Sequence, residues 1–247
     1  MKLDAITAII TGSSGHLGGE LALALCREGC NCICHYHTHK KRAQQIVEQI
    51  EQDGRKAVAV QADLTDPEQI ESIFDKALEI RIPQILVNSA AIFSRKPLSE
   101  ITLEQSRRIF DINVMAAVLT SKAFVKRLGE KVGQSDEVVG KIINITGVGG
   151  VSPWAKYLLY CSSKASLIGA TKALAKELAP SVCVNSIAPG LFSWPPGFNE
   201  EQKKRQLAFI PLGRKAEAQD ITAALIFLLK NDYITGQVLN VDGGRCI

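Results

Sequence analysis

Long apolar runs are missing from this sequence of 247 residues, and no stretch approaches the ~20 residues that a membrane helix needs. The apolar segment near the N-terminus is short and runs into a glycine-rich turn, so it predicts a first strand rather than a secretory signal peptide. Internal repeats, low-complexity tracts and linkers are also missing, so we expect one domain over residues 1–247. The seven cysteines are an odd number, which favours free thiols and a cytoplasmic location.

A large excess of one charge is also lacking, because 29 basic and 25 acidic residues leave a net charge of only +4. That charge favours an anionic cofactor but is too diffuse to indicate a nucleic-acid surface. Hydrophobic residues make up 46% of the chain and charged residues 22%, which is ordinary for a globular protein. We therefore expect a small molecule as the substrate, with no nucleic acid and no membrane as partner.

Short apolar runs alternate with amphipathic segments along the whole chain. The predicted strands are 6–10, 30–36, 57–61, 85–87, 138–145, 181–187 and 238–241. The predicted helices are 20–27, 43–53, 67–80, 103–127, about 160–178 and 218–229. Strands that alternate with helices predict an α/β fold, with a doubly wound parallel sheet and helices on both faces.

The turn after the first strand is rich in glycine, and a helix follows it. A strand, a glycine-rich turn and a helix together bring backbone N–H groups and a helix N-terminus to a diphosphate. Gly12 allows the tight turn, while Gly15 and Gly18 allow cofactor and strand to approach closely. The residues expected to bind the cofactor here are Gly12, Ser13, Ser14, Gly15, His16, Leu17 and Gly18.

An acidic residue is missing from the end of the second strand, where 35–42 reads HYHTHKKR. An Asp or Glu at this place would bind the ribose 2′-hydroxyl of NAD, whereas basic and hydroxyl groups suit a 2′-phosphate. We therefore expect NADP(H), with His37, Thr38 and His39 at the phosphate. A metal site is the competing interpretation, but side chains at i and i+2 of a strand are ~6.6 Å apart and no second ligand cluster appears. The neighbouring cysteines are better explained as small core residues.

Other strand ends supply further candidate cofactor contacts. Asp63 and Leu64 either contact the adenine side or begin the following helix as a cap. Small residues after the fourth strand leave room for a flat ring or a ribose beside the sheet. The contacts expected at these edges are Asn88, Ser89, Ala90, Thr146, Pro189 and Gly190. Phe93 is either a stacking platform for a substrate or a core residue.

Tyr160 and Lys164 are four residues apart, so in a helix they lie one turn apart on the same face. A lysine ammonium beside a tyrosine favours the phenolate and lowers the pKa of the phenol, which enables proton transfer to or from a substrate. The spacing alone is weak evidence, because amphipathic helices often carry such a pair. Asn113 lies among apolar residues and serves either in helix packing or in a proton relay.

The segment 191–210 is irregular, contains Trp194 and is long enough to form a lid over a substrate. It follows a predicted strand and precedes a predicted helix, so it lies at the same edge of the sheet as the other candidate residues. We expect Trp194 to cover the substrate.

Taken together, these motifs resemble the short-chain dehydrogenase/reductase family over the whole chain. The matching motifs are T-G-x-x-x-x-x-G at 11–18, N-S-A-A at 88–91, Asn113, Tyr160-x-x-x-Lys164, Pro189-Gly190 and T-G-Q-V-L-N-V-D-G-G at 235–244. The resemblance implies a single-domain Rossmann fold with a seven-stranded sheet, in an assembly that is usually a homotetramer. It also implies that Tyr160 donates the proton, Lys164 holds the nicotinamide ribose and Asn113 anchors a water in the relay.

Within that family, the sequence is most similar to the bacterial pteridine reductases. The similar stretches are H-Y-H at 35–37, N-S-A-A-I-F at 88–93 and L-A-P-S-V-C-V-N-S-I-A-P-G at 178–190, with Trp194-Pro195 soon after. This resemblance implies that Phe93 stacks a pterin against the nicotinamide. The leading hypothesis is therefore an NADPH-dependent reductase of a dihydropterin-like heteroaromatic substrate.

One departure from the family is the glycine at 147, because relatives carry Ser or Asp thirteen residues before the tyrosine. Losing that donor removes one hydrogen bond to the reacting group, a cost of ~2–4 kcal/mol in the barrier. Two alternatives therefore stay open beside the leading hypothesis. One is an NADP-dependent carbonyl reductase or alcohol dehydrogenase for a ketoacyl, sugar or steroid-like substrate. The other is a weakly catalytic NADP-binding sensor or subunit, which Gly147 favours and the intact Tyr160 opposes.

Overall fold

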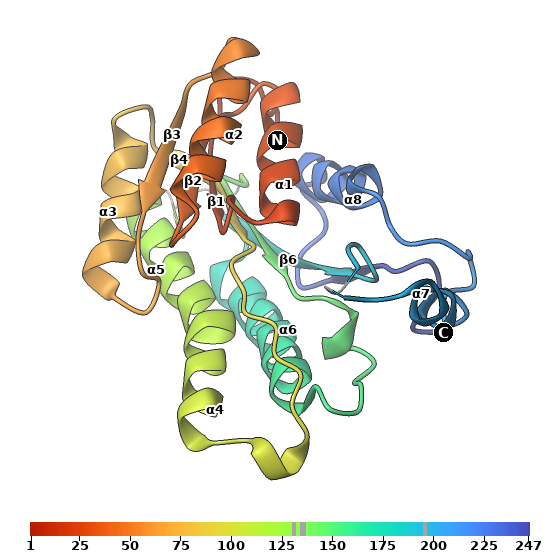
Figure 1. The fold of residues 1–247 in the computed structure, drawn as a ribbon. Coiled ribbons are helices and arrows are strands. Elements are labelled where there is room, and N and C mark those ends of the chain that lie inside the picture. Colours follow the sequence, from red (N-terminus) through yellow and green to blue (C-terminus); the bar gives the residue numbers. More distant parts are fainter. Residues whose placement is uncertain (130–131, 134–136, 195–196) are drawn as a thin grey trace.

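The computed structural model describes residues 1–129, 132–133, 137–194 and 197–247, which form one α/β domain (Figure 1). Seven parallel strands make a single sheet in the order β3-β2-β1-β4-β5-β6-β7. The strands are β1 (Thr7–Thr11), β2 (Asn31–Tyr36), β3 (Ala57–Gln61), β4 (Pro83–Asn88), β5 (Gly140–Ile145), β6 (Val182–Pro189) and β7 (Val238–Val241). The predicted single-domain Rossmann fold is confirmed, and the predicted strand ends differ by at most two residues.

Helices cover both faces of the sheet because successive strand residues point to opposite sides. Helices α1 (His16–Arg27), α2 (Lys40–Gln52) and α8 (Ala218–Lys230) pack on one face, where Leu25 and Leu225 share a core with Ile10. Helices α3 (Pro67–Leu78), α5 (Ala116–Leu128) and α6 (Leu158–Leu178) pack on the other, where Phe74 shares a core with Ile9. No helix among the described residues is both long and apolar enough to span a membrane.

The helix predicted over 103–127 is interrupted. Helix α4 (Leu103–Phe110) begins at a capping box on Thr102, then gives way to a π-helical turn over Asp111–Met115, and α5 continues from Ala116. The wider turn breaks the regular i→i−4 pattern at Asn113, and single π turns of this kind occur often at functional sites. The predicted continuous helix is therefore wrong at its centre, although both of its ends are close to the observed ones.

The segment 191–210 is more regular than predicted, because it contains helix α7 (Glu200–Leu207). The Asn199 side chain accepts a hydrogen bond from the Gln202 N–H, and the Gln202 side chain bonds back to the N-cap backbone. Residues 195–196 lie outside the described part of this segment. Residues 130–131 and 134–136, between α5 and β5, lie outside the described residues as well.

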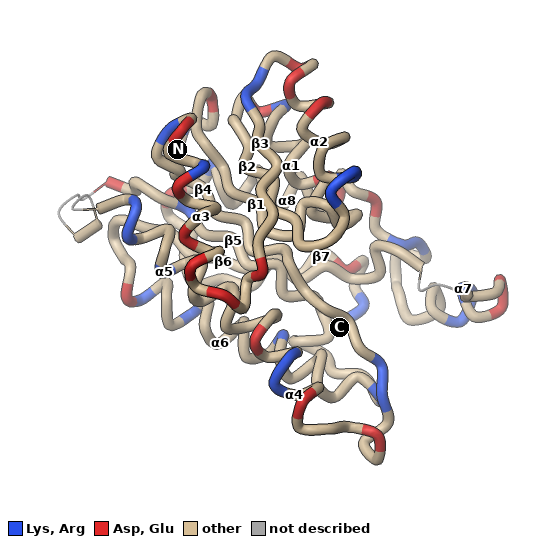
Figure 2. The backbone as a smooth tube through the Cα atoms, turned by 60° about the vertical axis from the view of Figure 1, so that its left-hand side comes forward, with Lys and Arg blue, Asp and Glu red and all other residues tan. Residues whose placement is uncertain are grey.

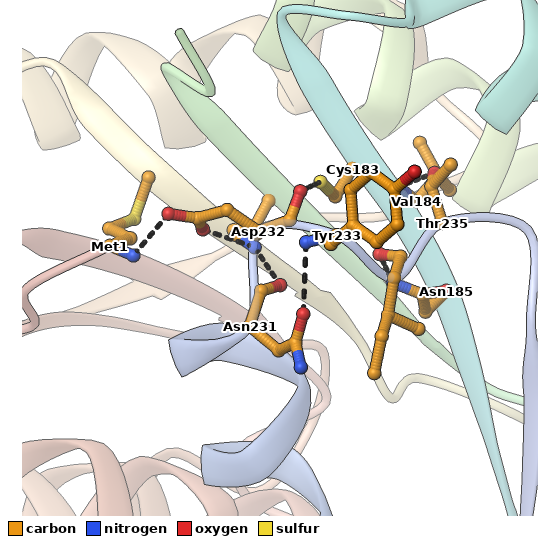
Figure 3. A network of polar contacts seen from close by, with 10 residues as sticks. Met1, Cys183, Val184, Asn185, Asn231, Asp232, Tyr233 and Thr235 are labelled. Atoms are coloured by element: carbon orange, nitrogen blue, oxygen red, sulfur yellow. Dashed lines mark hydrogen bonds and ion pairs between the residues drawn. The ribbon is translucent and has the colours of Figure 1, made fainter.

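A polar network connects the segment between α8 and β7 to the N-terminus and to β5 (Figure 3). The Asp232 carboxylate pairs with the N-terminal amine of Met1 at 2.7 Å and with the fully buried Lys141 Nζ at 2.7 Å. Nearby, the Asn185 amide donates to the Ile234 carbonyl at 2.7 Å. These contacts hold the strand β7 in register with β6, and β7 delivers the C-terminal residues to the site.

The strand order reverses between β1 and β4, so the carboxyl ends of these strands open a crevice between their connections. The predicted site residues follow the carboxyl ends of β1, β2, β3, β4, β5 and β6. The fold therefore gathers them along one edge of the sheet.

Candidate active site

Tyr160 and Lys164 lie in the first two turns of α6, which connects β5 to β6. The Lys164 ammonium is 5.9 Å from the centre of the Tyr160 ring, and its Nζ donates to the Ile145 carbonyl at 2.9 Å. Lys164 is almost fully buried, so this bond anchors the lysine to the last residue of β5. The helix therefore positions the two side chains together, as the spacing predicts.

The pKa values of this pair are set by burial. Burial, with a smaller contribution from Cys161, raises the pKa of Tyr160 to about 12, and burial lowers the pKa of Lys164 to about 8. The predicted lowering of the Tyr160 pKa is thus wrong for the protein alone. At neutral pH the phenol is protonated and the lysine is charged, which is the state that donates a proton to a substrate.

Gly147 lies directly beside the Tyr160 hydroxyl. Its backbone has φ +92° and ψ 147°, a combination essentially restricted to glycine. A Cβ at this position would lie 3.0 Å from the Tyr160 hydroxyl oxygen. The neighbouring Thr146 does not replace the missing donor, because its buried hydroxyl bonds Ser186 at 3.0 Å and the Ile187 carbonyl at 3.1 Å.

Asn113 connects three segments around the site. Its Oδ1 accepts from the Ile92 N–H at 2.8 Å, and its Nδ2 donates to the Ile92 carbonyl and to Ser163 Oγ, each at 3.0 Å. Ser163 Oγ in turn donates to the Tyr160 carbonyl at 2.7 Å. Asn113 therefore fixes the residue before Phe93 against α6, which is a packing role for its side chain; the predicted water relay stays a prediction.

Three aromatic rings cluster with the ring of Tyr160. Phe93 stands edge-on to Tyr160 with ring centres 4.6 Å apart, and it also contacts Tyr157 at 5.0 Å. Trp154 lies 5.7 Å from Tyr157 and stacks at 6.4 Å on Tyr160. Phe93 is 56% exposed, so the structure favours a surface for a substrate over the core alternative.

The tryptophan that contacts Tyr160 is Trp154, while the cover over the substrate expected of Trp194 stays a prediction. Trp194 instead lies under the Lys203 ammonium, 5.9 Å from the ring centre, within the segment 191–210. Trp154 comes six residues before Tyr160, in the connection that leads from β5 into α6. Its place at the carboxyl edge of β5 was the signal that sequence reasoning missed.

A cavity of about 980 Å³ extends from the glycine-rich turn across the ends of β2, β3 and β4. Its lining includes many of the predicted cofactor residues, namely Gly12, Ser14, Gly15, His37, Thr38, His39, Asp63, Leu64 and Ala90. Its lining also includes residues that were not predicted, namely His35, Ala62, Thr65, Ala91, Ile92, Leu103, Glu104, Arg107, Arg108, Asp111 and Ile112. Arg107 and Arg108 come from the last turn of α4, and their charge suits the anionic end of a dinucleotide.

Two glycines and a histidine shape the wall at the diphosphate position. Gly12 has φ +68°, and a Cβ there would lie 2.8 Å from the Ala90 backbone, while a Cβ on Gly18 would clash with the Gly12 carbonyl. The Gly12 N–H donates to His35 Nδ1 at 3.0 Å, and His35 Nε2–H donates to the Ala62 carbonyl at 3.0 Å. His35 therefore ties the turn to β2 and β3. The N-cap Gly15 leaves the first amides of α1 without a side-chain partner, which suits a diphosphate.

Helix α2 begins directly after the three predicted 2′-phosphate residues. Its N-cap, His39, makes no side-chain cap bond, and the Lys40 N–H donates to the Thr38 carbonyl at 3.1 Å, so the N–H groups of Lys41 and Arg42 are the ones open to an anion. His37 and Asp63 both line the cavity, with His37 Nε2 3.9 Å from Asp63 Oδ2. The alternative role for Asp63, as the cap of α3, is wrong. The residue that caps α3 is Asp66, whose side chain accepts from the Glu68 N–H at 2.9 Å. The residues here fit NADP(H).

Several predicted cofactor residues are used by the protein itself. Ser13 Oγ donates to the His35 carbonyl at 2.9 Å, and Asn88 Nδ2 donates to Asn144 Oδ1 at 2.9 Å. The Ser89 N–H donates to Thr11 Oγ1 at 3.0 Å. The described lining of the cavity also omits His16, Leu17, Gly18, Thr146, Tyr160, Lys164, Pro189 and Gly190. His16 instead lies 4.8 Å from the ring of Phe192 in the segment 191–210.

The chain is similar in sequence to proteins that are named as oxidoreductases. A family model described as enoyl-(acyl carrier protein) reductase matches residues 13–245. A 3-oxoacyl-[acyl-carrier-protein] reductase from Synechocystis sp. is 34% identical over 98% of this chain and 97% of its own. Glucose 1-dehydrogenase 2 from Bacillus subtilis is 31% identical over 99% of this chain and 96% of its own. These names place the chain among reductases and dehydrogenases, while the narrower likeness to pteridine reductases stays a prediction.

Solved structures agree in fold and in cofactor. A short chain dehydrogenase from Burkholderia cenocepacia in complex with NADP has a TM-score of 0.90 and 31% identity, with all of both chains covered. A blue fluorescent protein from a metagenomic library in complex with NADPH has the same TM-score and 30% identity, again over both full chains. With the Tyr160–Lys164 pair and the cavity that fits the dinucleotide, these likenesses show that the chain is an NADP-dependent oxidoreductase of the short-chain dehydrogenase/reductase family.

Proposed function

We propose that the protein is an NADPH-dependent carbonyl reductase with Tyr160 as the proton donor. The observation that carries the proposal is the half-buried Tyr160, 5.9 Å by its ring centre from the ammonium of the buried Lys164, which is anchored to the last residue of β5. Bound NADPH supplies the hydride to the carbonyl carbon. The carbonyl oxygen takes the proton from Tyr160 Oη, so the product is an alcohol. Lys164 stabilises the phenolate that remains.

Beside Tyr160, neither residue 146 nor residue 147 offers a side-chain hydrogen-bond donor to the substrate oxygen. Gly147 carries no hydroxyl and Thr146 uses its own within the sheet, so Tyr160 alone polarises the substrate oxygen from this side. Removing one such donor raises the barrier by ~2–4 kcal/mol. We therefore expect slow turnover of simple ketones, unless the substrate brings its own activating group.

A second candidate is reduction of a flat heteroaromatic substrate such as a dihydropterin. It is supported by the position of Phe93 and Trp154, whose rings lie 4.6 Å and 6.4 Å from the Tyr160 ring. Aromatic faces at these distances favour a flat ring as a substrate. In this candidate Tyr160 protonates a ring nitrogen rather than a carbonyl oxygen.

The segment 191–210 is proposed to cover the substrate in both candidates. Phe192 contacts His16, the first residue of α1, so the segment reaches the helix that follows the glycine-rich turn. A homotetramer is proposed as well, because the exposed apolar side chains of Leu103 and Leu158 offer a surface for self-association. The free thiols of the seven cysteines fit a cytoplasmic location.

The experiment that tests the proposal is NADPH oxidation by the purified protein with two substrate classes. One arm uses an acetoacetyl thioester and the other uses 7,8-dihydrobiopterin. Turnover of the thioester supports carbonyl reduction, and turnover of the pterin alone favours the second candidate. If neither compound, nor a panel of aldehydes and ketones, is reduced by protein that binds NADPH, the proposed reductase function is wrong.

A further inference from the structure

Arg245 places a positive charge at the rim of the aromatic cluster. Its guanidinium lies 5.2 Å from the centre of the Trp154 ring, and its Nη2 donates to Gln206 Oε1 at 3.0 Å. Figure 1 shows the C-terminus beside α7, the helix that carries Gln206. Trp154 in turn stacks on Tyr160, so Arg245 lies one aromatic ring away from the proton donor.

This charge has no carboxylate partner among the residues that the structure describes. The nearest acid along the chain, Asp242, accepts from the Gly244 N–H at 2.9 Å and from the Cys246 N–H at 3.0 Å. Its carboxylate is therefore occupied by the turn that follows β7. Arg245 is half-buried, and burial lowers its pKa, which is the cost of removing a cation from water without a partner.

Acidic residues are absent from the connections that follow β4, β5 and β6. No Asp or Glu occurs in the sequence at 88–99, 146–176 or 182–199, segments that include these connections, whereas Glu200 and Glu201 begin α7 and Asp242 precedes Arg245. Two of these segments carry Lys96 and Lys156, and the Lys96 N–H donates to the Lys156 carbonyl at 2.7 Å. Basic residues also mark the connection between β4 and α4 in Figure 2. The connections after β4 and β5 therefore carry a net positive charge.

Arg245 lies outside the lining of the cavity that fits the dinucleotide. The cavity that fits the dinucleotide is lined from β1 to β4 and α4, and its described lining includes neither Arg245 nor Trp154. Both residues belong instead to the side of Tyr160 where the aromatic rings gather. An arginine stacked beside an aromatic ring, with donors still unused, is the usual protein partner of a carboxylate or a phosphate.

We propose that Arg245 binds an anionic group, a carboxylate or a phosphate, on a substrate whose reducible group lies at Tyr160. Trp154 supports the guanidinium from one side and the substrate from the other. Arg245 is thereby a specificity-determining residue that selects small anionic substrates over neutral ones. This inference rests on the proposed reductase function, but its test reads out binding separately from turnover.

The test measures binding by calorimetry to protein loaded with NADP⁺, so that no hydride is transferred. Two matched pairs of aldehydes are used, 4-carboxybenzaldehyde with its methyl ester, and 4-formylphenyl phosphate with 4-methoxybenzaldehyde. We expect at least one anionic member to bind about 10- to 100-fold more tightly than its neutral partner, as for a hydrogen bond to a charged group. The pair with the larger ratio identifies the anion as carboxylate or phosphate.

Variants then assign the preference to Arg245. In Arg245→Gln the ratio falls towards 1, and in Arg245→Lys part of it remains. The matched control is Lys172→Gln, which removes the same charge from an exposed site later on α6 and keeps the ratio of the wild type. If Arg245 only supports the structure through its bond to Gln206 of α7, then Arg245→Gln weakens the binding of both members of a pair equally. That result would overturn the inference.

The inference is also wrong if the wild type shows no preference in either pair, or if Arg245→Gln keeps the preference. A separate assay of NADPH oxidation with the same four aldehydes distinguishes its failure from failure of the proposed function. Protein that prefers the anionic aldehydes but reduces none of them would contradict the reductase proposal alone. Protein that reduces both members equally well, with equal affinity, would contradict the Arg245 inference alone.

Discussion

At the scale of single residues, Gly147 decides how Tyr160 works. The glycine holds a conformation with φ +92°, so any side chain there is strained by about 1–3 kcal/mol. The strain adds to the crowding of a Cβ only 3.0 Å from the Tyr160 hydroxyl. Adding the serine of the relatives therefore does not restore their donor in this backbone.

The first prediction is that both Gly147→Ala and Gly147→Ser lower turnover and lower the free energy of unfolding by about 1–3 kcal/mol. Steady-state kinetics and urea denaturation check the two effects. The control is Gly169→Ala, at a glycine in the interior of α6 where a Cβ meets no atom within 4 Å. A Gly147→Ser protein that is faster than wild type would contradict the assignment and revive the sensor hypothesis.

The second prediction concerns pH. Burial lowers the pKa of Lys164 to about 8, whereas Tyr160 stays protonated up to about pH 12. As pH rises through about 8, Lys164 loses its charge and no longer stabilises the phenolate, so kcat falls. The pH profile of kcat checks this, and Lys164→Arg, which stays charged, should move the decline above pH 10. A decline that stays near pH 8 in that variant would assign it to another group.

At the scale of elements, His35 joins β2, β3 and the glycine-rich turn. Its two ring nitrogens bond the Gly12 N–H and the Ala62 carbonyl, and burial lowers its pKa to about 4 from an ordinary 6.5. The hydrogen bond to the Ala62 carbonyl and the nearby Asp63 raise this pKa, and His37 lowers it, all by less than burial does. Because protonation destroys the acceptor at Nδ1, the Gly12 N–H keeps its partner only while the ring is neutral.

The third prediction follows from that lowered pKa. Below pH 6.5 the unfolded chain binds a proton at His35 that the folded protein does not, so stability falls as pH decreases from 6.5 towards 4. The loss attributable to this group is up to about 3 kcal/mol. Urea denaturation at pH 7 and pH 4.5 measures it. In His35→Leu, which is less stable at both pH values, the difference between them should shrink; an unchanged difference would show that other groups cause it.

Also at the scale of elements, regular patterns were predictable and local irregularities were not. The alternation of apolar runs gave strands such as Ala57–Gln61 and Val238–Val241 with their observed ends. The π turn at Asp111–Met115 was invisible, because its apolar spacing is that of an ordinary helix.

The candidate site was predictable only where a motif fixes a local geometry. Tyr160 and Lys164 meet because a helix sets their spacing. By contrast, the sequence could not show that Trp154 rather than Trp194 stacks on Tyr160, since that depends on how two connections fold. Nor could it show the positive φ of Gly147, because glycine is compatible with every backbone region.

At the scale of the whole molecule, the network at Asp232 joins the N-terminus to the sheet. Asp232 is about half exposed, but its partner Lys141 is fully buried and has no water to replace a lost carboxylate. The network connects β5, β6 and the segment before β7, which leads to Arg245 (Figure 3).

The fourth prediction is that Asp232→Asn lowers the free energy of unfolding by about 1.5–3 kcal/mol, the value of hydrogen bonds to a charged group. Thermal or urea denaturation measures the change. Glu79→Gln is the matched control, because its pair with Lys76 is exposed on both sides and contributes at most about 1 kcal/mol. Equal effects of the two substitutions would show that the buried lysine does not depend on Asp232.

The proposed reductase function depends most on Tyr160 as the proton donor, and the variant Tyr160→Phe tests this role directly. The measurement compares NADPH binding and the rate of NADPH oxidation in wild type and variant, with the best substrate of the panel. Since only the hydroxyl is removed, we expect NADPH affinity to stay within about twofold, while kcat falls by about 10²–10⁴ as for loss of a general acid. A Tyr160→Phe protein that binds NADPH normally and keeps the turnover of the wild type would contradict the account.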